Sequence, residues 1–164
     1  MPQVFVSVGS NIDRERNIRS GVQCLRALYG PIETSRVYES ESVGFDGAPF
    51  FNLVVAFDTD SNVKKVIDNL HRIEREHGRV PGTKRFEART LDLDVLLYGD
   101  MVRHEDGVDI PRPEIERYAF VLCPLSELAP RLNHPGKGVT LRECWQNFGD
   151  QEQRLRQVEF KWEK

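Results

Sequence analysis

Hydrophobic residues recur along this chain with two different periods, and these periods outline its secondary structure. Alternation in residues 3–8 predicts a strand, after which the apolar spacing changes to that of a helix. Asp13 is expected to cap this helix, and Gly30-Pro31 is expected to close it. The helix should turn a single apolar stripe inward, made of Ile18, Val22, Leu25 and Leu28.

The same two periods alternate again further along the chain. Residues 32–40 are polar but β-leaning, which predicts a strand near the sheet edge, and residues 51–57 form a strongly apolar strand. Asp60 or Ser61 should cap the next helix, which ends at Gly78. Its inward positions are Val63, Val66, Ile67, Leu70 and Ile73. In the strand predicted at 89–98, one face should carry Leu91, Leu93, Val95 and Leu97.

The resulting order, β-α-β-β-α-β, predicts an α+β fold of the ferredoxin-like kind, with two helices packed on one antiparallel sheet. Beyond residue 101 we expect C-terminal additions: a proline-punctuated segment, a short helix at 141–148 and a final strand at 155–162. No repeat or linker is visible, so residues 1–164 are interpreted as one domain.

Composition and charge narrow the class of protein. Apolar residues make up 39% of the chain and charged residues 30%, which is typical of a globular protein. No apolar run approaches the roughly 20 residues that cross a bilayer, and the first residues resemble a strand rather than a leader. A net charge of −3 disfavours general nucleic-acid binding. Three widely spaced cysteines and no paired motif favour a cytoplasmic protein, and we also expect a monomer.

Candidate chemistry lies in the strand at 89–98, on the face opposite its leucines. Asp92 and Asp94 are separated there by roughly 7 Å, so both could ligate one hard cation or a closely spaced pair. A basic cluster lies just upstream and suits phosphate: Arg75, Arg79, Lys84, Arg85 and Arg89. Together they predict a nucleotide-using phosphoryl-transfer enzyme that lacks a P-loop motif. The simpler alternative is a solvent-facing strand beside a solvated loop.

The chain resembles 6-hydroxymethyl-7,8-dihydropterin pyrophosphokinases. The resemblance is strongest in Arg-Thr-Leu-Asp-Leu-Asp at 89–94. It continues, in the family's order, at residues 9–11, 50–52, 72–74, 78–80, 110–111, 119–122, 124–125 and 127–130. It implies transfer of pyrophosphate from ATP to the pterin's hydroxymethyl group in folate biosynthesis, with two Mg²⁺ ions and release of AMP.

The resemblance also implies roles for individual residues. Asp92 and Asp94 would hold the magnesium ions, and Arg79 and Arg89 would act as catalytic phosphate-binding groups. ATP would further contact His71, Glu74, Arg85 and Arg112. The pterin would lie against Val43, Gly44, Asn52, Phe86 and Phe120.

Each of these roles has a structural alternative in the sequence itself. Phe120 taken alone is more typical of a core residue. The alternative for Glu74 is that it only braces an arginine. His71 and His77, six residues apart, do not share a helix face and are interpreted by spacing as surface residues. Asn52 is stronger evidence, because an amide within an apolar strand needs a hydrogen-bond partner.

The chain departs from the family pattern near the nucleotide. Arg112 stands where a histidine is usual, Tyr118 replaces an arginine, Phe86 replaces a tryptophan, and residues 40–44 lack the usual prolines. A second hypothesis is therefore a catalytically impaired or repurposed member that binds nucleotide or pterin. A ferredoxin-like metal or RNA module is disfavoured by the acidic balance and by the absence of an aromatic RNA-binding motif.

Overall fold

The computed structural model describes residues 1–41, 47–78, 90–149, 153 and 155–163. One sheet is made of the strands β1 (Gln3–Ser10), β2 (Glu33–Thr34), β3 (Val37–Ser40), β4 (Phe50–Asp58), β5 (Asp92–Tyr98) and β8 (Leu155–Val158). A separate hairpin consists of β6 (Arg103–Glu105) and β7 (Val108–Ile110). The helices are α1 (Arg14–Tyr29), α2 (Val63–Glu76), α3 (Glu114–Arg117), α4 (Ala119–Leu128) and α5 (Leu141–Gln146).

The strand order confirms the ferredoxin-like prediction. The path through the sheet is β5-β1-β4-β3-β8, and its pairs are antiparallel. The β-α-β-β-α-β core is β1, α1, β3, β4, α2 and β5, which places the first strand in the centre, between the third and the fourth. Among the described residues, the strand that carries the two aspartates, β5, is the last strand on its side of the sheet.

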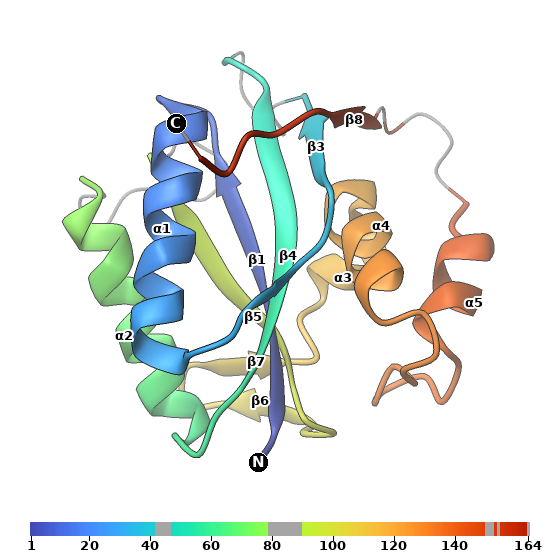
Figure 1. Ribbon diagram of the computed structural model, residues 1–164. Helices are drawn as coiled ribbons and strands as arrows, with labels where there is room; N and C mark the ends of the chain where they lie inside the picture. The colour runs from blue at the N-terminus through green and yellow to red at the C-terminus, as the bar shows by residue number, and fades with distance from the viewer. Residues whose placement is uncertain (42–46, 79–89, 150–152, 154, 164) are drawn as a thin grey trace.

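Helices cover both faces of the sheet (Figure 1). On one face, α1 and α2 pack over Val6, Leu53 and Leu93. On the other face, α3, α4 and α5 pack over Phe5, Val54 and Leu96. The C-terminal additions therefore form a third layer with its own core rather than a peripheral extension.

A β-bulge alters the predicted alternation of β5. Leu91, Leu93 and Val95 lie in the α1–α2 core as expected. Val6 pairs with Val95 but the preceding Phe5 pairs with Leu97, so Leu96 is an extra residue in the ladder. The expectation that Leu97 shares their face is therefore wrong, because the bulge turns it into the α3–α5 core with Phe5.

The segment at 32–40 is also more interrupted than predicted. It forms two short strands, and Ser35 lies between them. The Ser35 N–H donates to the Val54 carbonyl at 2.9 Å, while the Ser35 hydroxyl accepts from the Val54 N–H at 2.9 Å. β3 is not the sheet edge, because β8 pairs with it on its outer side.

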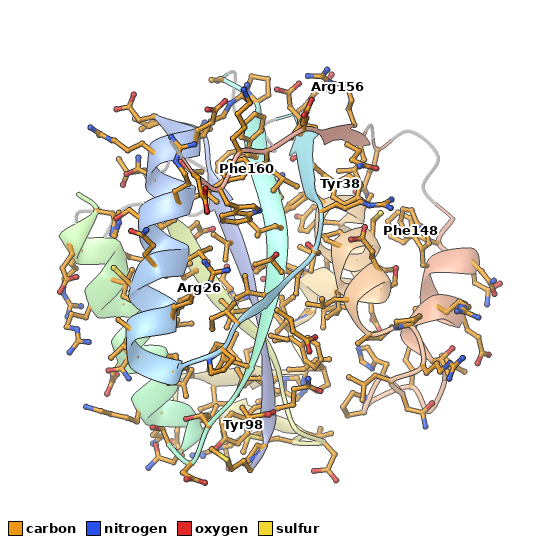
Figure 2. All side chains as sticks on the ribbon, viewed as in Figure 1. Arg26, Tyr38, Tyr98, Phe148, Arg156 and Phe160 are labelled. Atoms are coloured by element: carbon orange, nitrogen blue, oxygen red, sulfur yellow. The ribbon has the colours of Figure 1, made fainter. Side chains whose placement is uncertain are left out.

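Tyr38 links this part of the sheet to the third layer. It extends from β3 toward α4 (Figure 2), where its hydroxyl donates to the Glu127 carboxylate. The second Glu127 oxygen accepts from the Arg36 N–H at 2.8 Å. Burial, reinforced by the Glu127 contact, raises the pKa of the Tyr38 hydroxyl well above its ordinary value, which keeps it a donor.

Several predicted helix ends are corrected by the structure. Asp13 is at the N-cap of α1 but has φ 42° and makes no capping side-chain bond. Asn62, rather than Asp60 or Ser61, caps α2 by accepting from the Lys65 N–H at 2.9 Å. Leu28 does not belong to the buried stripe, since it is 40% exposed.

The C-terminal elements are shorter than predicted. The helix expected at 141–148 ends at Gln146, and the strand expected at 155–162 ends at Val158. The proline-punctuated segment contains the β6–β7 hairpin, α3 and α4, which periodicity did not reveal. Among the described residues, no helix is long and apolar enough to span a membrane.

Two leucines on α1 allow a matched test of this packing. Leu25→Ala removes a side chain with no exposed surface and should lower the free energy of unfolding by about 2–5 kcal/mol. Leu28→Ala, the same change one turn later, should cost less than about 1 kcal/mol. Urea denaturation measures both, and equal losses would contradict the placement of α1.

Candidate active site

The two aspartates of β5 lie beside the central strand of the sheet. Asp92 pairs with Gly9 and Asp94 with Ser7, and both carboxylates are partly exposed. Their side chains leave the sheet on the face opposite Leu93, as the sequence predicted. A cavity of about 340 Å³ is lined by both aspartates. The rest of the lining comes from other residues of β5, from β1, β3, β4, β7, α2, α3 and α4, and from loop residues that include Arg112.

Arg112 faces the aspartates from the loop between β7 and α3. Its Nη2 lies 3.3 Å from Oδ1 of Asp94, and its Nε donates to the Glu114 carboxylate. Burial of the guanidinium acts to lower the pKa of Arg112, but attraction by Asp94 and then Glu114 outweighs it, and the net pKa is raised. The group is therefore a permanent cation within an acidic wall.

Glu74 supports the aspartate-bearing strand from the opposite face. Its side chain is on α2, is 2% exposed, and accepts a hydrogen bond from the Leu93 N–H at 2.9 Å. Leu93 is the residue between the two aspartates, so this carboxylate fixes the backbone that positions both. This bond shows that Glu74 braces the strand, and its bracing of an arginine of the basic loop at 79–89 stays a prediction because that loop lies outside the described residues.

Asn52 lies in the cavity wall with its amide held in place. It is buried on β4, and its Nδ2 donates to the Ser40 hydroxyl at 2.7 Å. A β-carbon at Gly9 would lie 3.3 Å from the Asn52 Oδ1, so a larger residue at position 9 would crowd the amide. The partner that the sequence required is therefore a serine on the neighbouring strand.

Phe120 forms an aromatic part of the wall. It is partly exposed at the start of α4, lines the cavity, and stacks on Tyr118 with ring centroids 5.0 Å apart. Phe50 lines the same cavity from the first position of β4. A ring stacked on one side and open to the cavity on the other suits a flat ligand.

The two histidines of α2 have different environments. His71 is exposed at the cavity lining, in keeping with a surface residue near a ligand. His77 is half-buried and bridges two helices, because its ring nitrogens lie 2.7 Å from the Ile73 carbonyl and 2.8 Å from the Ser20 hydroxyl. The interpretation of His77 as a simple surface residue is wrong.

The remaining predicted site residues lie outside the described part of the chain. These are Val43, Gly44, Arg79, Arg85, Phe86 and Arg89. Their roles stay predictions from the sequence.

Sequence reasoning missed five polar residues that line the cavity: Ser7, Ser40, Glu41, Asp109 and Glu114. Asp109 is on β7, where its carboxylate contacts Nδ1 of His104. The Asp106-Gly107 pair was the available signal, since such pairs are typical of hairpin turns and would have predicted the strand that carries Asp109. Glu114 had no comparable signal.

Fold and site together define a class of protein: a ferredoxin-like domain whose edge strand presents two carboxylates to a cavity with an aromatic wall.

The sequence matches the 7,8-dihydro-6-hydroxymethylpterin-pyrophosphokinase family over residues 5–130. It is 31% identical to the 2-amino-4-hydroxy-6-hydroxymethyldihydropteridine pyrophosphokinase of Haemophilus influenzae, covering 92% of this chain and 95% of that protein. It is 36% identical to the same-named protein of Pseudomonas aeruginosa, covering 81% of this chain and 84% of that one.

Solved structures agree on the fold. A crystal structure of HPPK-DHPS in complex with substrates superposes with a TM-score of 0.71 at 11% identity, covering 90% of this chain and 45% of that chain. Wild-type HPPK-DHPS of Plasmodium falciparum gives a TM-score of 0.69 at 12% identity, covering 90% and 41%. This chain belongs to the 7,8-dihydro-6-hydroxymethylpterin-pyrophosphokinase family.

The hydrogen bond from Leu93 to Glu74 can be tested by mutation. Glu74→Ala leaves a buried N–H without its carboxylate acceptor and should lower the free energy of unfolding by about 1–3 kcal/mol. Glu74→Gln keeps an acceptor oxygen and should cost less. Glu76→Ala, an exposed glutamate on the same helix, should change stability by no more than about 0.5 kcal/mol in the same urea titration. A Glu74→Ala protein as stable as the Glu76→Ala protein would refute this role.

Proposed function

We propose that this protein transfers the β,γ-pyrophosphate of ATP to the hydroxymethyl oxygen of 6-hydroxymethyl-7,8-dihydropterin, as a step of folate biosynthesis. The observation that carries the proposal is one cavity lined by a carboxylate pair, a fixed amide and an open aromatic ring. Asp92 and Asp94 suit the charged half of the reaction, and Asn52 and Phe120 suit the pterin half.

The chemistry accounts for the charged half of the cavity. The pterin oxygen attacks the β-phosphorus, the bond between that phosphorus and the α–β bridging oxygen breaks, and AMP leaves while the hydroxyl proton is released. Negative charge is concentrated on the phosphates throughout, so positioning and neutralisation account for most of the catalysis. The proposed cofactors, two Mg²⁺ ions, would supply much of this neutralisation.

The donor set fits magnesium with ATP as co-substrate. The described residues hold no group of three or more His, Cys, Asp or Glu side chains placed to bind a metal. Two carboxylates are nonetheless the usual protein share of such sites, where phosphate oxygens and water supply the rest. We assign Asp92 and Asp94 as these ligands, with Glu74 holding their strand.

Cationic residues would hold the triphosphate. Arg79 and Arg89 are assigned to the transferring group, because a planar guanidinium matches two phosphate oxygens. Arg85, His71 and Arg112 are assigned to the nucleotide. Two of these, His71 and Arg112, line the described cavity beside the aspartates, which supports their assignment.

The pterin would occupy the other half of the cavity. Asn52, oriented by Ser40, would contact its hydrogen-bonding edge, and Phe120 would stack on one face. Val43, Gly44 and Phe86 are assigned to the pterin by resemblance alone. That residues 1–164 act as one domain and as a cytoplasmic monomer stays a prediction of the sequence.

A direct assay tests the proposal against a repurposed binding protein. Incubation with ATP, magnesium and 6-hydroxymethyl-7,8-dihydropterin should produce AMP, detected by chromatography, and should produce none without the pterin. ATP binding with no AMP formed would favour the repurposed protein.

Asp94→Asn tests the metal assignment. It removes the charge of one proposed ligand and should lower turnover at least about 100-fold, with the fold retained by circular dichroism. Asp100→Asn, an exposed aspartate just beyond the end of β5, is the control and should leave turnover unchanged. Turnover near that of the unmodified protein in Asp94→Asn would exclude this residue as a required ligand.

Phe120→Ala tests the pterin assignment. Loss of the stacked ring should raise KM for the pterin about tenfold while changing KM for ATP less than about twofold. Phe148→Ala removes a phenylalanine stacked on Trp145 and serves as the control, with both KM values retained. Equal changes in the two KM values for Phe120→Ala would contradict the assignment.

A further inference from the structure

Arg112 is fixed against one of the two candidate metal ligands. The backbone N–H of Arg112 donates to the Leu96 carbonyl at 3.0 Å, which ties this part of the loop to the aspartate-bearing strand. Glu114 holds the Nε side of the guanidinium, and Nη2 lies 3.3 Å from Asp94 Oδ1. The exposed fractions of the Arg112 and Asp94 side chains are 20% and 28%, so the pair is partly shielded from water.

The guanidinium of Arg112 has several negatively charged neighbours. Among the described residues, the Arg112 guanidinium lies near three carboxylates, those of Asp92, Asp94 and Glu114, and all three attract it. It therefore reduces the repulsion between the two aspartates and occupies coordination space on Asp94. The guanidinium would repel a divalent cation bound to the Asp94 carboxylate. A bound triphosphate would instead attract the guanidinium.

We propose that Arg112 competes with magnesium for Asp94, and that its transfer from Asp94 to an ATP phosphate makes magnesium binding depend on the nucleotide. The inference rests on the proposed function in one respect, that Asp94 is a magnesium ligand. It assigns to Arg112 a positioning role in metal loading, beyond that of an ATP contact. A neutral residue at this position, such as the histidine usual in the family pattern, would lack this competition.

Metal affinity measured on the full-length protein tests the proposal without turnover. Mn²⁺ serves as the probe, titrated by electron paramagnetic resonance, with and without an ATP analogue whose α–β bridging oxygen is replaced by methylene. In the absence of nucleotide, Arg112→Gln should bind Mn²⁺ about fivefold more tightly than the unmodified protein. The analogue should enhance Mn²⁺ affinity several-fold less in Arg112→Gln, because binding of the two ligands is reciprocally coupled.

Further variants separate charge from shape. Arg112→Lys keeps the cation and should retain the Mn²⁺ affinity of the unmodified protein within about twofold. Arg112→Met is uncharged at every pH and should bind Mn²⁺ as tightly as Arg112→Gln. The two neutral variants are independent replacements, so one that fails to fold leaves the other to decide.

Controls distinguish the possible failures. Arg103→Gln removes an arginine of similar exposure that pairs with Asp106 on the β6–β7 hairpin, and it should leave Mn²⁺ affinity unchanged. If Asp94→Asn binds Mn²⁺ as tightly as the unmodified protein, the metal assignment of the proposed function fails. If Asp94→Asn binds weakly but the neutral variants at position 112 bind no more tightly than the unmodified protein, only the competition proposed for Arg112 is overturned.

Discussion

The register of β5 at the side of the sheet is the constraint on which the site depends. Leu93 must face the α1–α2 core, and only in that register do Asp92 and Asp94 both face the cavity. An outer strand is paired along one side only, so its outward N–H groups need other partners. Glu74 supplies one by accepting from the Leu93 N–H. A buried carboxylate on one face of the sheet thereby fixes the strand that carries two cavity-lining carboxylates on the other.

The bulge in β5 has a related consequence. If the strand alternated without interruption, Leu97 would join Leu93 and Val95 in the first core. Because Leu96 is an extra residue in the ladder, the inward and outward positions of the strand are exchanged beyond it. The aspartate-bearing half follows one in–out pattern and the remaining half follows the opposite pattern. Both Leu96 and Leu97 can then pack under the third layer, close to where Arg112 bonds the Leu96 carbonyl. This local irregularity joins the aspartate-bearing strand to the loop that faces it.

Features of the fold that depend on nearby residues could be predicted from the sequence, whereas features that depend on residues distant in the sequence could not. Periodicity was sufficient to locate β1, α1, β4, α2 and β5, because apolar residues recur in each with the spacing of its secondary structure, although it did not reveal the bulge in β5. It failed where partners come from elsewhere: Ser35 interrupts a strand by bonding Val54, and Asn62 replaces two equally plausible caps. The carboxylate pair and Asn52 were visible as polar residues within apolar strands. Glu114 was not visible, since its role depends on Arg112 and on a hairpin that periodicity did not reveal.

The third layer changes how the site should be understood. The ferredoxin-like core contributes Asp92, Asp94 and Asn52, whereas Arg112 and Phe120 come from the segment that covers its other face. The two halves differ in how strongly the fold constrains them. The aspartates follow from the register of a strand buried on one face, so the core holds them in place. Arg112 lies in the connection between β7 and α3, where Asp94 and Glu114 hold its guanidinium, so a substitution there acts first on the electrostatics of the site.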